Sequence, residues 1–190
     1  GSSKITVILS GMALTTIFSA AISFFCLINS DLASAYASFS VGSISQVRLE
    51  NLLLPGIMIL IALLISLILS KRIDILCLGD SVASSLGVRV KLLRTSCLIA
   101  SSLAASAVVS YAGLLGFVGL IVPHIARALV GERVFPCLLC GGMVGSILVI
   151  LGDTIGRTMF APTEVPVGIM MALIGSPFFL FLLFRRKYYV

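Results

Sequence analysis

The stretch KRIDILCLGDSVASSLGVRVKLLR, from Lys71 to Arg94, guides the interpretation of the whole chain. It lies between two runs too apolar for water, and its five cations outnumber its two carboxylates. Because positively charged loops of membrane proteins face the cytoplasm, we expect residues 71–94 to form a cytoplasmic loop. Within it, Asp80, the run to Leu86 and then Gly87 predict a short helix capped by Asp80 and stopped by Gly87. A cytosolic partner could push on such a helix; the plainer alternative is an ordinary connector between two spans.

The composition of the 190-residue chain indicates a polytopic membrane protein. Hydrophobic residues make up 59% of the sequence and charged residues 11%, and the mean hydropathy is +1.23. These values lie far outside those of soluble domains. The net charge of +6 does not indicate nucleic acid, because the cations flank apolar runs and form no basic stripe interleaved with aromatics. We therefore predict an all-α integral membrane protein, a polytopic helix bundle in a lipid bilayer.

The hydropathy pattern predicts about six membrane-spanning helices. The first apolar run, residues 5–28, is long enough to cross ~30 Å of hydrocarbon. The expected spans lie at about residues 5–28, 52–70, 92–111, 113–132, 136–157 and 167–184. Residues 29–51 should face outside, with a short helix near Gly42. With both termini inside, eleven of the 13 Lys and Arg residues fall on the cytoplasmic side, and Arg48 and Arg157 fall outside.

Small and hydroxyl-bearing residues recur within the predicted spans. Thr15, Ser19 and Ser23 in the first span serve either close helix packing or the lining of a solute path. The fifth span carries GxxxG spacing at each end, which predicts close helix packing there. These two pairs are Gly141 with Gly145 and Gly152 with Gly156. The last span should be broken at residues 175–177, where Gly-Ser-Pro occurs.

The polar groups of the fourth span and the cysteines indicate structural roles. Pro123 should kink its helix and free a carbonyl that His124 or a water could satisfy, so His124 is expected to be a structural partner at the inner interface. Cys137 and Cys140 form a CxxC, but a zinc site needs more ligands and His124 is the sole histidine. We expect the five cysteines to be reduced, and we expect neither a metal site nor a cofactor on this chain.

Four blocks of the sequence carry a family resemblance. They are ILCLGDSVASSLGV (75–88), GFVGLIVPHIARALVG (116–131), GDTIGR (152–157) and EVPVGIMMALIGSPFFLFLL (164–183). In this order they resemble the signature blocks of the FecCD-type permeases, the membrane subunits of ATP-binding-cassette (ABC) importers for iron-siderophores, haem and vitamin B12. Members of that family typically have ten spans, and this chain resembles the last six. The first four would belong to a longer chain or be supplied by a second one.

The resemblance implies different roles for different segments of the single permease domain, residues 1–190. The segment from Leu78 to Val88 would form coupling helices in a groove of a cytosolic ATPase, which would bind ATP and Mg and rock the permease between outward- and inward-open states. The matching positions in this segment are Leu78, Gly79, Asp80, Ala83, Leu86, Gly87 and Val88. Arg157 would dock an acidic side chain of a periplasmic or lipid-anchored substrate-binding protein. The permease itself would hydrolyse nothing and would lie in the bacterial cytoplasmic (inner) membrane.

The resemblance also implies where the solute crosses. In the family the path lies between two permease subunits, identical or different, with the equivalents of the first and last spans beside it, which favours the path interpretation of Thr15, Ser19 and Ser23. The positions that match structural motif residues are Gly116, Gly119, Pro123, His124, Arg127, Asp153, Pro166, Gly168 and Pro177. One departure is the outer segment SFSVGSIS (38–45), which lacks the aromatic often found before the family's Gly-Ser pair.

Two other function classes remain as alternatives. An intramembrane enzyme or a secondary transporter would use His124 and Asp153 as buried polar groups, since an ionisable residue in a membrane is a functional candidate by default. Against this, Arg157 stands four residues after Asp153 and can pair with it on the helix. No nucleophile motif or second metal ligand accompanies His124.

Overall fold

The computed structural model describes residues 4–44, 47–159 and 164–187, and it divides the chain into two compact units. The first unit, Gly1–Ser40, holds α1 (Lys4–Ile28) and almost all of α2 (Ser30–Val41). Asn29 separates the two helices, and its Oδ1 accepts a hydrogen bond of 3.0 Å from the backbone N–H of Asp31. This is the N-cap interaction that starts a helix. The short outer helix expected near Gly42 therefore lies earlier, and Gly42, with φ +73°, follows its end.

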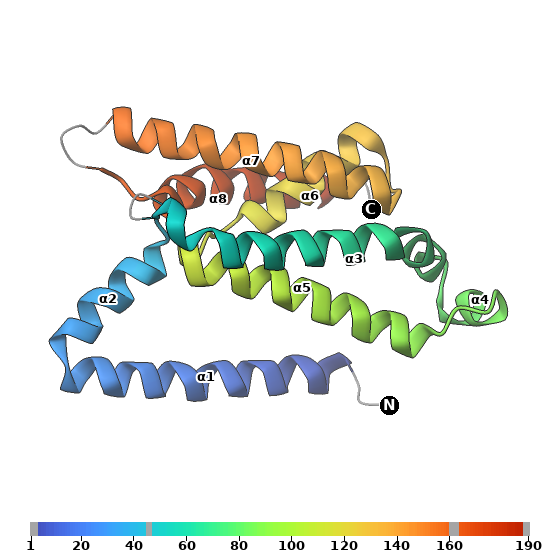
Figure 1. Cartoon of the computed structure of the whole chain (residues 1–190), viewed down its shortest axis with the longest axis horizontal. Coiled ribbons are helices and arrows are strands. Elements are labelled where there is room, and N and C mark those ends of the chain that lie inside the picture. Colours follow the sequence, from blue (N-terminus) through green and yellow to red (C-terminus); the bar gives the residue numbers. More distant parts are fainter. Residues whose placement is uncertain (1–3, 45–46, 160–163, 188–190) are drawn as a thin grey trace. The chain divides into compact units, whose positions relative to one another are not determined.

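The second unit, Val41–Val190, contains a 3-10 turn and six α-helices among its described residues (Figure 1). They are η1 (Leu49–Asn51), α3 (Leu53–Cys77), α4 (Asp80–Ser85), α5 (Val90–Ala112), α6 (Val118–Val130), α7 (Val134–Thr158) and α8 (Val167–Lys187). The main packing pairs are α3 with α5, α6 with α7, and α7 with α8. The described part of the chain is thus all-α, as predicted from the composition.

Small side chains hold α3 against α5. The buried residues of these helices are Pro55, Ala62 and Ser70 on α3, and Leu93, Ala100, Ala107 and Ala112 on α5. Three of those on α5 recur every seven residues, which places them on one seam of the helix. Alanine at such positions lets two backbones approach closely, so packing replaces the hydrophobic effect that is absent between helices in lipid.

The predicted GxxxG packing of α7 is confirmed at both ends. At Gly141 and Gly145, a Cβ would lie 3.6 Å from the side chain of Val122 on α6. At Gly156 a Cβ would lie 2.6 Å from the carbonyl oxygen of Val165, and at Gly152 it would collide with Met171 of α8. Larger residues at Gly152 and Gly156 would therefore force a shift against α8 and Val165, whereas a methyl group at Gly141 or Gly145 would make an ordinary van der Waals contact.

Each of the six predicted spans contains an α-helix, and these helices differ in length. Four described helices are long and apolar enough to cross a membrane, at Ile8–Ile28, Leu53–Cys77, Val90–Ala112 and Val134–Thr158. Within the described residues that could be tested in this way, the apolar parts of α6 and α8, Val118–Val130 and Val167–Phe181, are shorter. The predicted fourth span is short because residues 113–117 are not helical, and both Gly113 and Phe117 have positive φ.

Two expected helix boundaries are wrong. The break predicted at residues 175–177 does not occur, since α8 runs through Pro177. Proline inside a helix is tolerated in membrane proteins, where neighbouring groups satisfy the freed carbonyl. At the inner side, α3 continues through Lys71 and Arg72 to Cys77, so the helix extends seven residues beyond the predicted end of the second span.

Candidate functional site

The end of the second unit that the charge pattern predicts to face the cytoplasm, called the inner end from here on, is built around the short helix α4. Leu78 and Gly79 alone separate it from α3, and Gly79 adopts φ +115°, which only glycine reaches readily. The predicted helix over residues 80–86 is confirmed, and Gly87 with φ +79° ends it, with the N–H of Val88 donating to the carbonyl of Ala83 at 3.0 Å. The predicted cap is wrong, because Asp80 is the first helical residue and makes no cap hydrogen bond.

The carboxylate of Asp80 instead binds Arg94 on α5. Arg94 Nη2 lies 2.8 Å from Oδ1 and 2.9 Å from Oδ2 of Asp80, and more than half of each side chain is exposed. An exposed pair of this kind contributes about 0–1 kcal/mol to stability. The pair joins the first residue of α4 to α5.

One side of α4 is anchored and the other is presented outward. Ala83 is fully buried, whereas Leu78, Val82 and Leu86, each four residues apart, are exposed. Val82 and Leu86 are one turn apart and lie on one face of this segment, whereas Leu78 precedes it, on the other side of Gly79. This exposed apolar face is a candidate docking surface, because it is not part of this unit's core.

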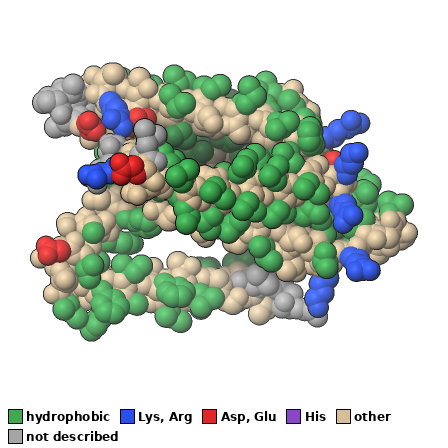
Figure 2. All heavy atoms as spheres, viewed as in Figure 1, with side chains coloured by type: hydrophobic (Ala, Val, Ile, Leu, Met, Phe, Trp, Pro, Cys, Tyr) green, Lys and Arg blue, Asp and Glu red, His purple; other side chains and the backbone are tan. Residues whose placement is uncertain are grey.

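Cations surround this candidate docking surface. Figure 2 shows Lys and Arg side chains gathered at the end of the helices near α4. The exposed cations of the inner segments are Lys71, Arg72, Arg89, Lys91, Arg94, Arg127 and Arg133. An apolar helix face within a cationic rim suits a partner with an apolar groove and acidic edges.

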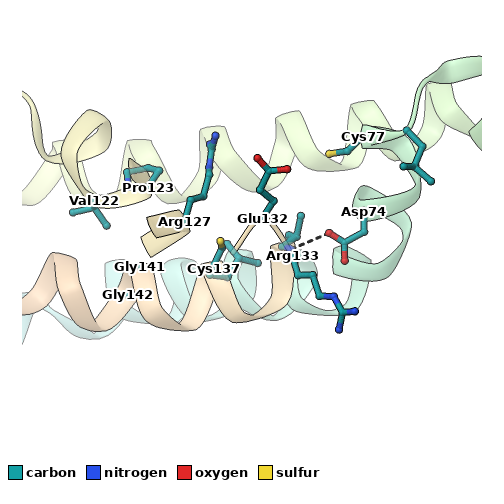
Figure 3. A pocket seen from close by; sticks show the side chains of 13 residues that line it. Asp74, Cys77, Val122, Pro123, Arg127, Glu132, Arg133, Cys137, Gly141 and Gly142 are labelled. Atoms are coloured by element: carbon teal, nitrogen blue, oxygen red, sulfur yellow. Dashed lines mark hydrogen bonds between the residues drawn. The ribbon is translucent and has the colours of Figure 1, made fainter. Parts of the chain in front are cut away.

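A second contact at the inner end joins α3 to α7. The backbone N–H of Val134, the first residue of α7, donates a 2.9 Å hydrogen bond to Oδ1 of Asp74 on the last turn of α3. Figure 3 shows this bond beside a hollow of about 870 Å³ between the two helices and α6. Arg127, Glu132 and Arg133 line the hollow together with the apolar Val122. Nothing in the sequence of either helix signals this contact, since its partners are 60 residues apart.

At the outer end of α7, Arg157 and Asp153 form the predicted ion pair. Arg157 Nε donates to Asp153 Oδ2 at 2.8 Å, and the two side chains are 40% and 20% exposed. A guanidinium carries five N–H donors. Because this bond uses Nε, the terminal NH2 groups of Arg157 are available to a carboxylate from outside the chain. The pair therefore orients the Arg157 side chain and leaves some of its hydrogen-bond donors available.

The predicted path residues all lie on α1. Thr15, Ser19 and Ser23 are exposed and four residues apart, so they share one face of that helix. Thr15 Oγ1 donates to the carbonyl of Gly11 at 2.9 Å, so its hydroxyl is satisfied within the helix. Such a hydroxyl needs no further partner in lipid or at a helix contact. Lining of a solute path by this face stays a prediction.

The family-motif residues differ in how closely neighbouring segments approach them. Gly168 meets the chain after α2: its N–H donates to the carbonyl of Gly42 at 3.1 Å, and a Cβ would collide with the carbonyl of Val41. Pro166 immediately precedes α8, and its carbonyl accepts the N–H of Ile169 at 3.0 Å. By contrast, no described atom lies within 4 Å of a Cβ built on Gly116 or Gly119. Among the described residues, no neighbouring helix therefore approaches these two motif positions closely.

His124 and Asp153 do not form a joint site. The ring of His124 makes an edge-to-face contact with Phe178 of α8, with centroids 6.2 Å apart. Val122, two residues earlier, packs on Gly145 of α7, and Asp153 lies two turns further along α7, roughly 12 Å away at 1.5 Å per residue. Within the described ranges no group of three or more His, Cys, Asp or Glu could hold a metal ion. This geometry gives the enzyme alternative no reactive pair.

The fold and its two ends define a class of protein. Apolar helices cross the membrane several times, an anchored helix with an apolar outer face stands at the cationic end, and an arginine stands at the other end. These are features of a multi-pass transport protein, and comparison with known proteins identifies its family. A model of the FecCD transport family matches residues 1–185, and the chain belongs to this family.

Individual relatives agree with this membership. The chain is 35% identical over 190 residues to the "Probable iron chelatin transport system permease protein" of Helicobacter pylori (strain ATCC 700392 / 26695), an alignment that covers 98% of this chain and 57% of that protein. It is 33% identical over 181 residues to the hemin transport system permease protein HmuU of Yersinia pestis, covering 95% of this chain and 54% of HmuU. The chain thus spans a little over half the length of these relatives.

A solved structure shares the fold. It is an inward-facing conformation of a protein assigned to the metal-chelate type of ABC transporter. It superposes with a TM-score of 0.88 at 33% identity, over 96% of this chain and 61% of the solved chain. The family resemblance of the four sequence blocks is therefore confirmed by both sequence and structure.

Proposed function

We propose that this chain forms the transmembrane permease part of an ABC importer for metal chelates of the iron-siderophore, haem or vitamin B12 type. Membership of the FecCD transport family carries the proposal, and the names of the two relatives, an iron chelatin permease and a hemin permease, support iron chelates or haem as the solute class. The exposed apolar face of α4 supports coupling to a separate ATPase. The importer would lie in the bacterial cytoplasmic membrane.

The partners follow from the chemistry of the two ends. At the inner end, Leu78, Val82 and Leu86 would enter a groove of a cytosolic ATPase, which would hold ATP and Mg while this chain binds no cofactor. At the outer end, Arg157 would meet a carboxylate of a periplasmic or lipid-anchored substrate-binding protein. The solute path would lie between this chain and a second permease subunit. Helix α1, which carries Thr15, would line it on this side, and the corresponding helix of the second subunit on the other.

Reconstitution tests the proposed function. The chain, completed by the other spans of its permease, would be placed in proteoliposomes with its ATPase and binding protein, and uptake of labelled ferric siderophore, haem and cobalamin would be compared. We expect uptake of one chelate class that requires both ATP and the binding protein. Uptake without ATP would indicate a secondary transporter, and no uptake of any metal chelate would contradict the proposed solute class.

A further inference from the structure

The structure points to a role for Asp74, which the sequence blocks do not include. We propose that Asp74 is a positioning residue that ties the inner end of α7 to the junction of α3 with α4, so that the coupling helix and the outer docking residue act on one rigid helix. This inference rests on the proposed function. It concerns how a signal crosses the permease, and it adds a residue to the coupling machinery.

The position of Asp74 on its own helix is unfavourable. It lies in the last turn of α3, which carries no basic residue there. A carboxylate near the C-terminus of a helix opposes the helix dipole, whereas a carboxylate at an N-terminus is stabilised by it. The contact with the N-terminus of α7 therefore stabilises the Asp74 carboxylate and offsets its unfavourable interaction with the dipole of α3. Its placement favours a dedicated contact over a solvated surface charge.

The N-terminus of α7 lacks a cap of its own. Arg133 stands at the N-cap position with extended backbone and makes no side-chain cap hydrogen bond, and an arginine side chain has no acceptor. The first four N–H groups of a helix need outside partners. Asp74 supplies one of these from another helix, and both Asp74 and Val134 are half-buried. Half-burial strengthens such a charge-assisted bond relative to an exposed one.

The connection from Asp74 to α4 is short and continuous. The N–H of Leu78 donates to the carbonyl of Ile75 and that of Gly79 to Leu76, each at 3.1 Å, so the end of α3 is bonded up to the first residue before α4. Displacement of α4 therefore moves the last turn of α3. Through the Asp74 carboxylate, the same displacement reaches the start of α7.

The other end of α7 carries the docking arginine. The helix has 25 residues, or roughly 36 Å at 1.5 Å per residue, and ends just after Arg157. Gly152 and Gly156 are buried against α8, and Gly141 and Gly145 contact α6, so the helix is held along its length. A helix restrained in this way moves as one body. Docking of the binding protein at Arg157 and movement of the coupling helix α4 would then be linked mechanically through α7.

The test measures stimulation in the assembled importer. In proteoliposomes, the ATPase rate with substrate-loaded binding protein is divided by the basal rate. We expect Asp74→Ala to lower this ratio about tenfold or more, the scale of one hydrogen bond to a charged group. Glu132→Ala is the matched control, because Glu132 lines the same hollow, is exposed, and makes no hydrogen bond or ion pair with any described residue. It should keep the wild-type ratio.

Hydrogen exchange provides a second measurement that does not depend on transport. The amide of Val134 should exchange about tenfold faster in Asp74→Ala than in wild type, and Asp74→Asn, which keeps an acceptor oxygen, should lie between them. If Asp74→Ala does not assemble, Asp74→Asn carries both measurements. An unchanged stimulation ratio in the assembled variant overturns the proposal, as does an equal loss in Glu132→Ala.

The wild-type importer separates this inference from the proposed function. A wild type without uptake and without stimulation contradicts the function itself. A working wild type whose Asp74 variants lose basal and stimulated ATPase rates in equal proportion shows a purely structural residue, and it contradicts the inference alone.

Discussion

Replacement of Gly87 by valine should uncouple ATP hydrolysis from transport. Gly87 ends α4 with φ +79°, and no described atom lies within 4 Å of a Cβ built on it. A larger side chain would therefore meet no neighbour, and the cost comes from the backbone conformation alone. For an ordinary residue a left-handed conformation costs roughly 1–2 kcal/mol, and a β-branched residue lies at or above the upper end. A cost of about 2 kcal/mol shifts the equilibrium between the native and a rearranged α4 by about 30-fold.

The assay compares uptake with ATPase rate in proteoliposomes for wild type, Gly87→Val and Gly87→Asn. Asparagine tolerates the left-handed region, so Gly87→Asn is the matched control at the same position and should retain most uptake. We expect Gly87→Val to lose uptake severalfold or more while ATP hydrolysis persists. Equal uptake in the two variants would refute the reasoning, since it would show that the end of α4 carries no coupling and that residues 78–88 are a simple connector.

Three further predictions concern topology, packing and docking. Single cysteines in a cysteine-free background should be labelled by an impermeant reagent only from the cytoplasm at Ser81 and only from outside at Thr158, and labelling of both from one side would contradict the orientation. Gly168→Ala should lower the free energy of unfolding by about 2 kcal/mol because its methyl group meets backbone, whereas Gly142→Ala, in open space, should leave it unchanged or raise it by up to about 1 kcal/mol in thermal melts. Arg157→Glu should weaken affinity for the binding protein about tenfold at low ionic strength and less at high salt. An acidic-to-basic change on that partner should restore the affinity. If this charge swap does not restore it, the intrahelical ion pair with Asp153 is the only role of Arg157.

The parts of the fold that were predicted correctly depend on neighbours in sequence. Hydropathy over about 20 residues located α1, and the run from Asp80 to Gly87 located α4. The pairing of Arg157 with Asp153 followed from a spacing of four on one helix. Each of these signals is local, so one sequence is sufficient to detect it.

The contacts that position the site were not predicted because they join distant segments. Asp80 was expected to cap its own helix, yet its carboxylate binds Arg94, and Asp74 was counted only as a charge of the loop although it binds the start of α7. A carboxylate has several possible partners of similar strength, and packing of the helices decides between them. The charge pattern of the loop predicts its side of the membrane but not these bonds.

Two glycines in similar sequence surroundings show why the packing between distant helices could not be predicted from the sequence. In sequence, Gly119 and Gly175 look alike, since each lies in an apolar helix beside a proline-containing turn. No described atom is near the Cβ position of Gly119, whereas a Cβ on Gly175 would collide with Phe117, whose Cγ lies 2.7 Å from it. Phe117 adopts φ +62°, an uncommon conformation for a bulky residue, and it starts α6 there. The conformation of Phe117 thus depends on the absence of a side chain 58 residues away, and we expect enlargement of Gly175, rather than of Gly119, to shift the start of α6.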